Sequence, residues 1–230
     1  DWSSDVCSSD LGGNIYMAGG AADGNNRPAG YAYDFGYRNE VSLNDIGVGF
    51  GKFVDVFTGG GDLVIRAFAK NAGMSAFNFQ SLDEFVTGNG QIFIDTRASA
   101  AVEAFEYFIS AESEAGALFS SHATAVPAIS ISASISGTSA QAMRLYTQNS
   151  SNPTTIQSLA STGGGISINS RLGSLSTTTG TFLAATNLLS ANGAITFSSN
   201  AVLSYTNQAY TQAWGRSEER RVGKECLRLC

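Results

Sequence analysis

The stretch GGGDLVIRA (59–67) decides the fold, because it joins three glycines to a short segment of apolar residues. Similar phrases recur as GGNIYM (12–17), GNGQIFI (88–94), GGGISIN (163–169) and NGAITF (192–197). In the first stretch Leu63 and Ile65 are two residues apart, and a period of two places such residues on one face of a β-strand. A glycine before each strand fits a tight corner with positive φ. The sequence therefore predicts short strands separated by turns.

The same alternation assigns residues to the two faces of each strand. The predicted inward pairs are Ile15 and Met17, Leu63 and Ile65, Ile92 and Ile94, Ile166 and Ile168, and Ile195 and Phe197. The predicted outward residues are Tyr16, Val64, Phe93, Ser167 and Thr196. Further strands are expected at FVDVF (53–57), SAFNF (75–79), AISISASI (128–135), TIQSLA (155–160), TFLAA (181–185) and AVLSY (201–205).

The spacing of the phrases predicts a repeat. Taking Gly13, Gly61, Gly90, Gly165 and Gly193 as anchors, with weaker copies near Gly36, Gly116 and Ala140, gives a unit of about 25 residues. One unit cannot bury its own apolar face, but stacked units can, which favours a β-solenoid. The alternative is an antiparallel β-sandwich, which also has many short strands joined by turns. The abundant Ser, Thr and Asn favour the solenoid, because such residues stack in ladders between layers.

The segment 98–116 (ASAAVEAFEYFISAESEAG) is ambiguous between strand and helix. Val102, Phe105 and Ile109 have helical spacing, and Ala and Glu favour helices. Phe105, Tyr107 and Ile109 also alternate, and aromatic residues favour strands. We predict a strand here, with a short helix as the alternative.

Both ends of the chain differ in composition from the rest. If Cys7–Leu11 is written in the codons TGC TCT TCC GAT CT, the reverse complement encodes Arg-Ser-Glu-Glu, as found at 216–219. Residues 1–11 and 216–230 resemble translated sequencing-adapter DNA, so we exclude them from fold reasoning. The expected organisation is two artefactual tails flanking one β-solenoid repeat domain at 12–215, a fragment of a longer protein.

The composition of 12–215 excludes several classes of site. All three cysteines lie in the tails, so a disulfide scaffold, a thiolate zinc site and a cysteine nucleophile are excluded. The tails hold five of the 13 Lys/Arg and six of the 19 Asp/Glu, leaving a net charge of −5. That balance argues against a nucleic-acid partner, which needs clustered basic residues. No apolar run is long enough for a transmembrane helix.

A family resemblance follows from the glycine-led phrases GGNIYMAGG (12–20), GGGDLVIRA (59–67), GGGISINS (163–170) and LLSANGAITFSSN (188–200). They resemble the coils of filamentous-haemagglutinin-type secreted proteins and autotransporter passengers. The resemblance implies a right-handed parallel β-helix, secreted or displayed on a bacterial cell surface, with an adhesive or structural role. It implies surface glycans or proteins of a host cell as partners.

The catalytic candidates are one serine–histidine stretch and a set of acidic residues. His122 is the only histidine, and it adjoins Ser120 and Ser121 without a nucleophile elbow, so an outward polar histidine is the simpler interpretation. Paired carboxylates could serve a polysaccharide lyase or glycoside hydrolase, the alternative function. The acidic candidates are Asp62, Asp95, Glu103, Glu106, Glu112 and Glu114, with Arg66 and Arg97 near them. A solvated ion-pair face explains the same residues with fewer requirements, and we favour it.

Cofactor and metal sites are not predicted. Asp23, Asn25 and Asn26 resemble the start of a calcium loop, but no glutamate stands at the closing position, and Asp-Gly-Asn-Asn is typical of a turn. The glycines at 59–61 precede a strand and lack the Lys-Ser/Thr of a phosphate-binding loop.

The stretch YAYDFGY (31–37) is the strongest ligand-binding candidate. Its four rings alternate, so one strand face could present Tyr31, Tyr33, Phe35 and Tyr37. Exposed, these rings would suit a sugar or a protein partner; buried, they would form part of the core, which we favour. The sequence as a whole predicts a non-enzymatic adhesive or structural surface element.

Overall fold

The computed structural model describes residues 13–22, 27–33, 48–69, 76–98, 104–107, 115–136, 142–146, 152–172, 179–184, 186–200, 202–205 and 210–213. Every regular element in these ranges is a β-strand, so the predicted all-β class is confirmed for them. The same ranges contain no helix with the length and apolar character needed to cross a membrane. Both tails, 1–11 and 216–230, lie outside the described residues.

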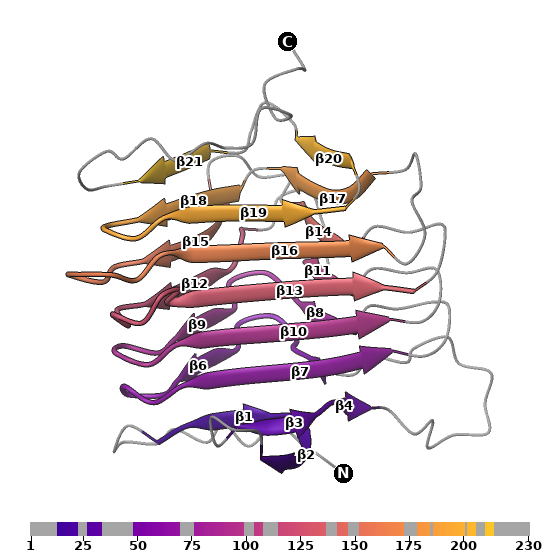
Figure 1. Ribbon diagram of the computed structural model, residues 1–230, viewed down its shortest axis with the longest axis horizontal. Coiled ribbons are helices and arrows are strands. Elements are labelled where there is room, and N and C mark those ends of the chain that lie inside the picture. The colour runs from indigo at the N-terminus through magenta and orange to yellow at the C-terminus, as the bar shows by residue number, and fades with distance from the viewer. Residues whose placement is uncertain are drawn as a thin grey trace.

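Three large parallel sheets account for most of the strands (Figure 1). Sheet I runs β1 (Ile15–Met17), β7 (Leu63–Ala69), β10 (Ile92–Ala98), β13 (Ile129–Ile135), β16 (Ile166–Leu172), β19 (Ile195–Ser199), with β4 (Ala32–Tyr33) also on β7. Sheet II runs β5 (Val48–Gly49), β8 (Phe77–Phe79), β11 (Phe105–Tyr107), β14 (Met143–Tyr146), β17 (Thr179–Ala184), β20 (Val202–Tyr205). Sheet III runs β6 (Asp55–Phe57), β9 (Glu84–Val86), β12 (Leu118–Ser121), β15 (Thr154–Ser158), β18 (Thr186–Ser190), β21 (Tyr210–Ala213).

The order of pairing is regular. From β5 onward the chain visits sheets II, III and I in turn, so each strand pairs in parallel with the strand three places later. Figure 1 shows the result as strands stacked one above another in chain order. The antiparallel alternative does not describe these sheets, because only the small pair β2 (Gly19–Ala22) and β3 (Pro28–Gly30) is antiparallel.

The spacing between paired residues differs from the expected repeat of about 25 residues. Leu63 pairs with Ile92 and Ile92 pairs with Ile129, which are offsets of 29 and 37 residues. The anchor at Gly116 was wrong because this glycine precedes β12 in sheet III, whereas Gly61 and Gly90 precede strands of sheet I. The equivalent position before β13 is occupied by Pro127 and Ala128, where no glycine marks the repeat.

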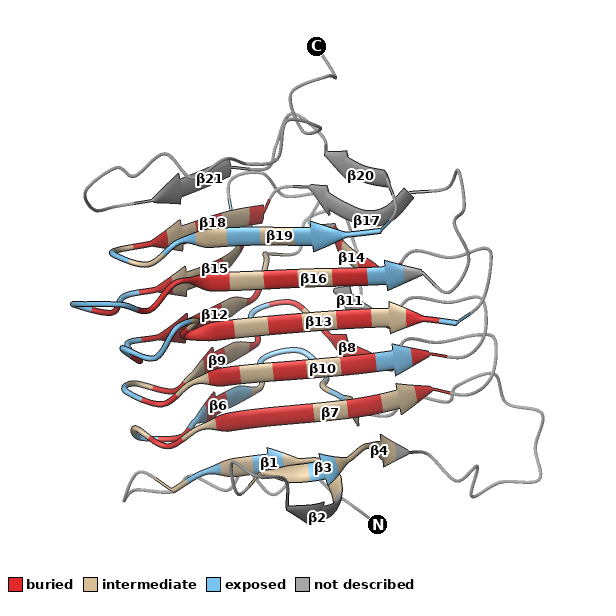
Figure 2. Cartoon of the chain, viewed as in Figure 1, coloured by how far each residue is buried: buried red, intermediate tan, exposed pale blue. Residues whose placement is uncertain are grey.

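The core lies between the sheets and is built by the alternating residues. Along β10 and β13 buried residues alternate with half-buried or exposed ones, as Figure 2 shows. The predicted inward residues of β7, β10 and β16 are at most 2% exposed. Those of β1 and β19 are only partly buried and pack against the same core. Each pairs with a single neighbouring strand of sheet I, which explains the difference.

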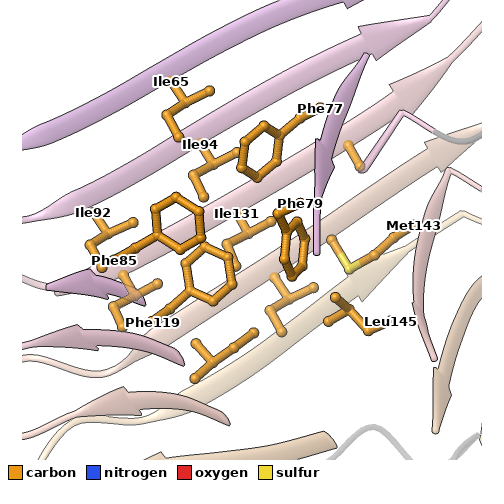
Figure 3. Close-up of a cluster of buried hydrophobic side chains, with 14 of the residues drawn as sticks. Ile65, Phe77, Phe79, Phe85, Ile92, Ile94, Phe119, Ile131, Met143 and Leu145 are labelled. Carbon is orange, nitrogen blue, oxygen red and sulfur yellow. The ribbon is translucent and has the colours of Figure 1, made fainter. Parts of the chain in front are cut away.

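Aromatic side chains fill one end of this core (Figure 3). Phe85 and Phe119 come from neighbouring strands of sheet III and stack with ring centroids 4.6 Å apart. Phe79 of sheet II meets the Phe119 ring edge-on at 5.1 Å. These rings occupy the space where sheets II and III face sheet I.

The anchoring glycines are required by close packing. A Cβ on Gly90 would lie 1.9 Å from the carbonyl oxygen of Gly61, and one on Gly61 would lie 2.4 Å from the backbone of Gly13. The anchoring Gly165 has a positive φ of 101°, whereas in the corners of Gly61 and Gly90 positive φ occurs at the preceding glycines Gly60 and Gly88. The expectation of positive φ is therefore confirmed at Gly165, and in the other two corners the positive φ lies one or two residues before the anchor.

A column of buried hydroxyl groups accompanies these corners. It consists of register-equivalent residues at the ends of the sheet III strands, each at most 1% exposed: Thr58, Thr87, Ser121, Ser158 and Ser190. We call this column the hydroxyl ladder. Thr87 Oγ1 donates to the Gly90 carbonyl at 2.6 Å, and Ser190 Oγ donates to the Gly193 carbonyl at 2.6 Å. Each hydroxyl replaces a hydrogen bond that the corner backbone would otherwise make to water.

The additional strands expected from the sequence are present. β6, β8, β13, β15, β17 and β20 overlap the six predicted stretches. Within 98–116, residues 105–107 form a strand, as predicted, while 99–103 and 108–114 lie outside the described residues.

Candidate functional site

A short segment, residues 27–33, which we call the strap, lies beside β7 at the β1 end of sheet I (Figure 1), and its side chains reach the outer face of β7 and β10. Its β4 end pairs with β7, with Ala32 opposite Ala67. Its middle is held by Arg66, whose Nη1 donates to the Ala29 carbonyl at 3.1 Å. The strap is thus fastened to the sheet through its backbone.

The first residue of the strap, Arg27, adds a charged anchor. Its Nη2 donates to Asp62 Oδ2 at 2.6 Å and to Gln91 Oε1 at 2.7 Å. Gln91 N in turn donates to Asp62 Oδ1 at 2.8 Å, and Gln91 Nε2 donates to the Pro127 carbonyl at 2.7 Å. The Arg27 and Asp62 side chains are only 15% and 26% exposed, so their attraction is screened less than that of a surface pair. This network links the strap to three successive strands of sheet I.

The second anchor is Tyr31, whose hydroxyl donates to Asp95 Oδ2. The Arg97 guanidinium lies 4.6 Å from the centroid of the Tyr31 ring, within cation–π range. Burial and the hydrogen bond to Asp95 together raise the pKa of Tyr31 well above its usual range. The phenol therefore stays protonated at neutral pH and acts as a hydrogen-bond donor rather than as a base or nucleophile.

Phe93 forms the centre of the covered face. The guanidinium carbons of Arg66 and Arg27 lie 5.2 Å and 5.7 Å from its ring centroid. Val64, its register partner on β7, is completely buried, although the alternation predicted it to be outward and exposed. The strap explains this difference, because its side chains reach over the outer face of β7 and β10 and exclude solvent there.

Of the four predicted aromatic residues, only Tyr31 and Tyr33 lie in the described residues. Tyr31 is half-buried against Arg97 and Asp95, and Tyr33 belongs to β4. Phe35 and Tyr37 lie outside the described residues.

Among the acidic candidates for sugar chemistry, only Asp62 and Asp95 have described side chains, and these two do not form a pair. Asp95 is opposite Arg66 in the register, and Arg66 lies four residues after Asp62. At about 3.3 Å per residue, Asp62 and Asp95 are therefore offset by about 13 Å along the strands, beyond the 5–9.5 Å that glycoside hydrolysis uses. Glu103, Glu112 and Glu114 lie outside the described residues, and of Glu106 only the backbone, in β11, is described.

The serine–histidine stretch is organised for packing. Ser121 Oγ donates to the Gly90 carbonyl at 2.7 Å, and Ser120 Oγ accepts a hydrogen bond from Gln157 Nε2 at 3.1 Å. His122 is exposed just beyond the end of β12. The two hydroxyls are thus held by Gly90 and Gln157, and His122 matches its interpretation as an outward polar residue.

Asp83 is the most perturbed carboxyl group among the described residues. Its side chain is fully buried at the corner between β8 and β9, where it accepts hydrogen bonds from Val54 N at 3.0 Å and Gln80 N at 2.8 Å. Burial raises its pKa to about 6, against the lowering effect of these two bonds, and the nearby charge of Asp55 adds to the increase. A single buried carboxyl that caps backbone N–H groups stabilises a corner.

Metal ligands do not gather in the described ranges, where no three His, Cys, Asp or Glu side chains could hold an ion together. The calcium-loop candidates Asp23, Asn25 and Asn26 lie outside those ranges.

The sequence pattern missed the network around the strap. Asp62 and Gln91 each follow an anchoring glycine and precede a strand of sheet I, so the repeat itself places them side by side. No signal in the sequence identifies Arg27 as their partner, because 35 residues separate it from Asp62.

The charges of this region are satisfied within the protein: Arg27 with Asp62, and Asp95 with Tyr31 and Arg97. The arrangement can fasten a segment, but it presents no nucleophile beside a base. No family model, curated protein or solved structure matches the chain.

Proposed function

We propose that the protein is a non-enzymatic adhesive or structural element of an exported bacterial repeat protein, similar to filamentous-haemagglutinin-type proteins and autotransporter passengers. In this proposal the three sheets are the faces of a right-handed parallel β-helix, and each set of three strands is one coil. The observation that carries it is the parallel pairing of each strand from β5 to β18 with the third strand after it, maintained across all three sheets. Parallel connections between strands are almost always right-handed.

The side chains at the inner positions of the sheets and at the corners support a structural role. The inner positions are filled by aliphatic and aromatic residues, and the corners are held by glycine contacts and the hydroxyl ladder. Such a stack gives a stiff support whose length grows with the number of coils, while its outer faces remain free to vary. The absence of cysteine from 12–215 is consistent with export of an unfolded chain.

The proposed adhesive role is tested with the intact chain coupled to fluorescent beads. Beads are washed over arrays of surface glycans and extracellular-matrix proteins, and over cultured epithelial cells, with albumin-coated and heat-denatured-protein beads as controls. We expect retention above both controls on at least one surface. In parallel the protein is incubated with a panel of polysaccharides. Release of reducing ends or of unsaturated uronic acids would favour the lyase or hydrolase alternative.

The proposed origin of the tails is tested at the level of DNA. If residues 1–11 and 216–226 derive from sequencing adapters, the coding DNA for the two ends contains one sequence and its reverse complement. Codons at 216–219 other than AGA TCG GAA GAG would refute that origin. The uncut gene would then be examined for a secretion domain.

A further inference from the structure

An exposed apolar surface lies on the outer side of β6 and β9, away from the strap. Phe53, Phe57 and Leu82 are 68%, 44% and 47% exposed, although large apolar side chains are usually buried. The surface, which we call the β6–β9 patch, consists of Phe53, Asp55, Phe57, Leu82, Glu84 and Val86.

The register arranges these six residues in three pairs. Asp55 is opposite Glu84, and Phe57 is opposite Val86. Phe53 is next to Leu82, because Phe53 N donates to the Ser81 carbonyl at 3.1 Å. Neighbouring strands are about 4.8 Å apart, and alternate residues on one strand are about 6.7 Å apart. The patch therefore presents an apolar pair, an acidic pair and a second apolar pair in a row along the strands.

The first apolar pair is held in an unfavourable backbone conformation. Phe53 and Leu82 have φ angles of +63° and +60°, a region that bulky residues rarely adopt and that costs on the order of 1–3 kcal/mol for each. Their side chains gain little from burial, since both are exposed. Glycine or asparagine would serve the corner better if folding alone selected the residue. An exposed apolar side chain that also strains the backbone points to a role in contact with another molecule rather than in folding.

The acidic pair defines the chemistry of the surface. Neither Asp55 nor Glu84 forms an ion pair with a described residue, and like charges directly opposite one another destabilise a sheet. Asp83, the buried residue that directly precedes Glu84 in the sequence, adds to the negative potential of the patch when its carboxyl group is ionised. Lys52 precedes the patch, so carboxylates outnumber basic groups around it.

We propose that the β6–β9 patch binds an extended segment of a partner protein whose alternate side chains are apolar, basic and apolar. The outer side chains of an extended chain repeat every two residues, so such a segment matches the three pairs along the strands. A basic side chain would neutralise Asp55 and Glu84, and the flanking apolar side chains would cover Phe53 with Leu82 and Phe57 with Val86. The inference rests on the proposed adhesive role only in assuming that the protein binds another macromolecule.

The test uses the full chain and a fluorescein-labelled peptide, Thr-Val-Thr-Lys-Thr-Val-Thr with blocked ends, whose second, fourth and sixth side chains lie on one face, in fluorescence anisotropy titrations. A peptide with glutamate in place of lysine is the matched probe. We expect saturable binding of the lysine peptide, weakened by salt, and none of the glutamate peptide. The double variant Phe53→Asn, Leu82→Asn should lower the affinity at least about tenfold, and Asp55→Asn with Glu84→Gln should do the same and remove the salt dependence.

Asparagine tolerates positive φ, so the Phe53→Asn, Leu82→Asn variant should unfold at or above the wild-type temperature. Loss of binding therefore cannot be ascribed to misfolding. Val126→Ser, which changes a residue that is 77% exposed outside the patch, is the control and should bind normally. Absence of saturable binding of the lysine peptide, equal binding of both peptides, or unchanged binding by the asparagine variant would each overturn the proposal. Bead retention by a protein that does not bind the lysine peptide would overturn it while leaving the proposed adhesive role in place.

Discussion

At the scale of single residues, the tightest constraint is the contact between anchoring glycines of successive strands. The Cβ that alanine would add at Gly90 meets the Gly61 carbonyl oxygen at 1.9 Å and its carbon at 2.2 Å. Both atoms belong to the backbone of a neighbouring strand, so neither can move aside as a flexible side chain would. The close approach of the strands therefore depends on a hydrogen atom in place of a side chain.

We expect Gly90→Ala to destabilise the protein by about 2 kcal/mol or more, because the two strands must separate locally. Gly51→Ala is the control, since no atom lies within 4 Å of its added Cβ, and it should be neutral. The measurement is the midpoint of urea unfolding followed by circular dichroism. Equal midpoints for the two variants would contradict the role assigned to Gly90.

Asp83 is a second residue whose environment sets its behaviour. Its pKa is raised to about 6 from an ordinary value of 3.8, mainly by burial. The folded protein therefore binds a proton more tightly than the unfolded chain does. The contribution of this group to stability is fully present below pH 4 and is lost as the pH rises through 6.

Ionisation of Asp83 should consequently lower the free energy of unfolding of the wild-type protein by on the order of 2 kcal/mol between pH 4 and pH 7. The Asp83→Asn variant should lack this decrease. The asparagine variant also loses one backbone hydrogen bond, but that loss is the same at every pH. The measurement is urea unfolding of both proteins across this range. Parallel stability curves would show that Asp83 does not titrate as described.

At the scale of elements, each corner between sheet III and sheet I combines a hydroxyl with a glycine. The sequence Thr/Ser-x-x-Gly occurs at 58–61, 87–90 and 190–193. At Ser121 the residue after three positions is Thr124, and the hydroxyl bonds instead to the Gly90 carbonyl of the preceding corner and to Ala123 N. The ladder thus continues where the sequence motif is broken.

We expect Ser121→Ala to cost about 1–3 kcal/mol, because the buried Ala123 N–H loses its acceptor and the Gly90 carbonyl keeps only the hydrogen bond from Thr87. Ser121→Thr should restore most of the stability, since threonine stands at the equivalent Thr58 and Thr87. Ser132→Ala on the outer face of β13 is the control, because no described residue bonds to its hydroxyl. Thermal unfolding of the three variants tests this order. A Ser121→Ala variant as stable as Ser132→Ala would exclude the ladder as a stabilising element.

At the scale of the whole molecule, stability comes from contacts between neighbouring strands in the stack. Phe119 is fully buried and contacts Phe85 from the adjacent strand of its sheet and Phe79 from another sheet. It therefore connects successive strands of one sheet and also joins two sheets.

Phe119→Ala should lower the free energy of unfolding by about 3–5 kcal/mol through lost burial and the cavity left behind. Phe57→Ala, the same change at a residue that is 44% exposed, should have little effect. Calorimetry of both variants measures the difference. Similar unfolding temperatures would mean that the aromatic cluster contributes little to the stack.

The local structure was largely predictable, and the site was not. Alternation identified the strands because period two is a local property, as at Ile92 and Ile94. The repeat length was underestimated because Pro127 and Ala128 replace the expected glycine before β13. Val64 was placed on the exposed face because alternation cannot detect a cover supplied by residues more than thirty positions away, such as Arg27.

The sequence by itself determined that the described residues form β-strands, which residues of most strands face inward, and where the glycine corners lie, because each depends on neighbours within a few residues. Only the tertiary structure decided which strands pair, the offsets of 29 to 37 residues between β7 and β19 of sheet I, and the partners of the strap. Those features are contacts between distant parts of the chain. The repeats that separate these parts differ in length and in side chains. Which strands pair therefore depends on how the whole core packs, and no single segment of the sequence encodes that packing.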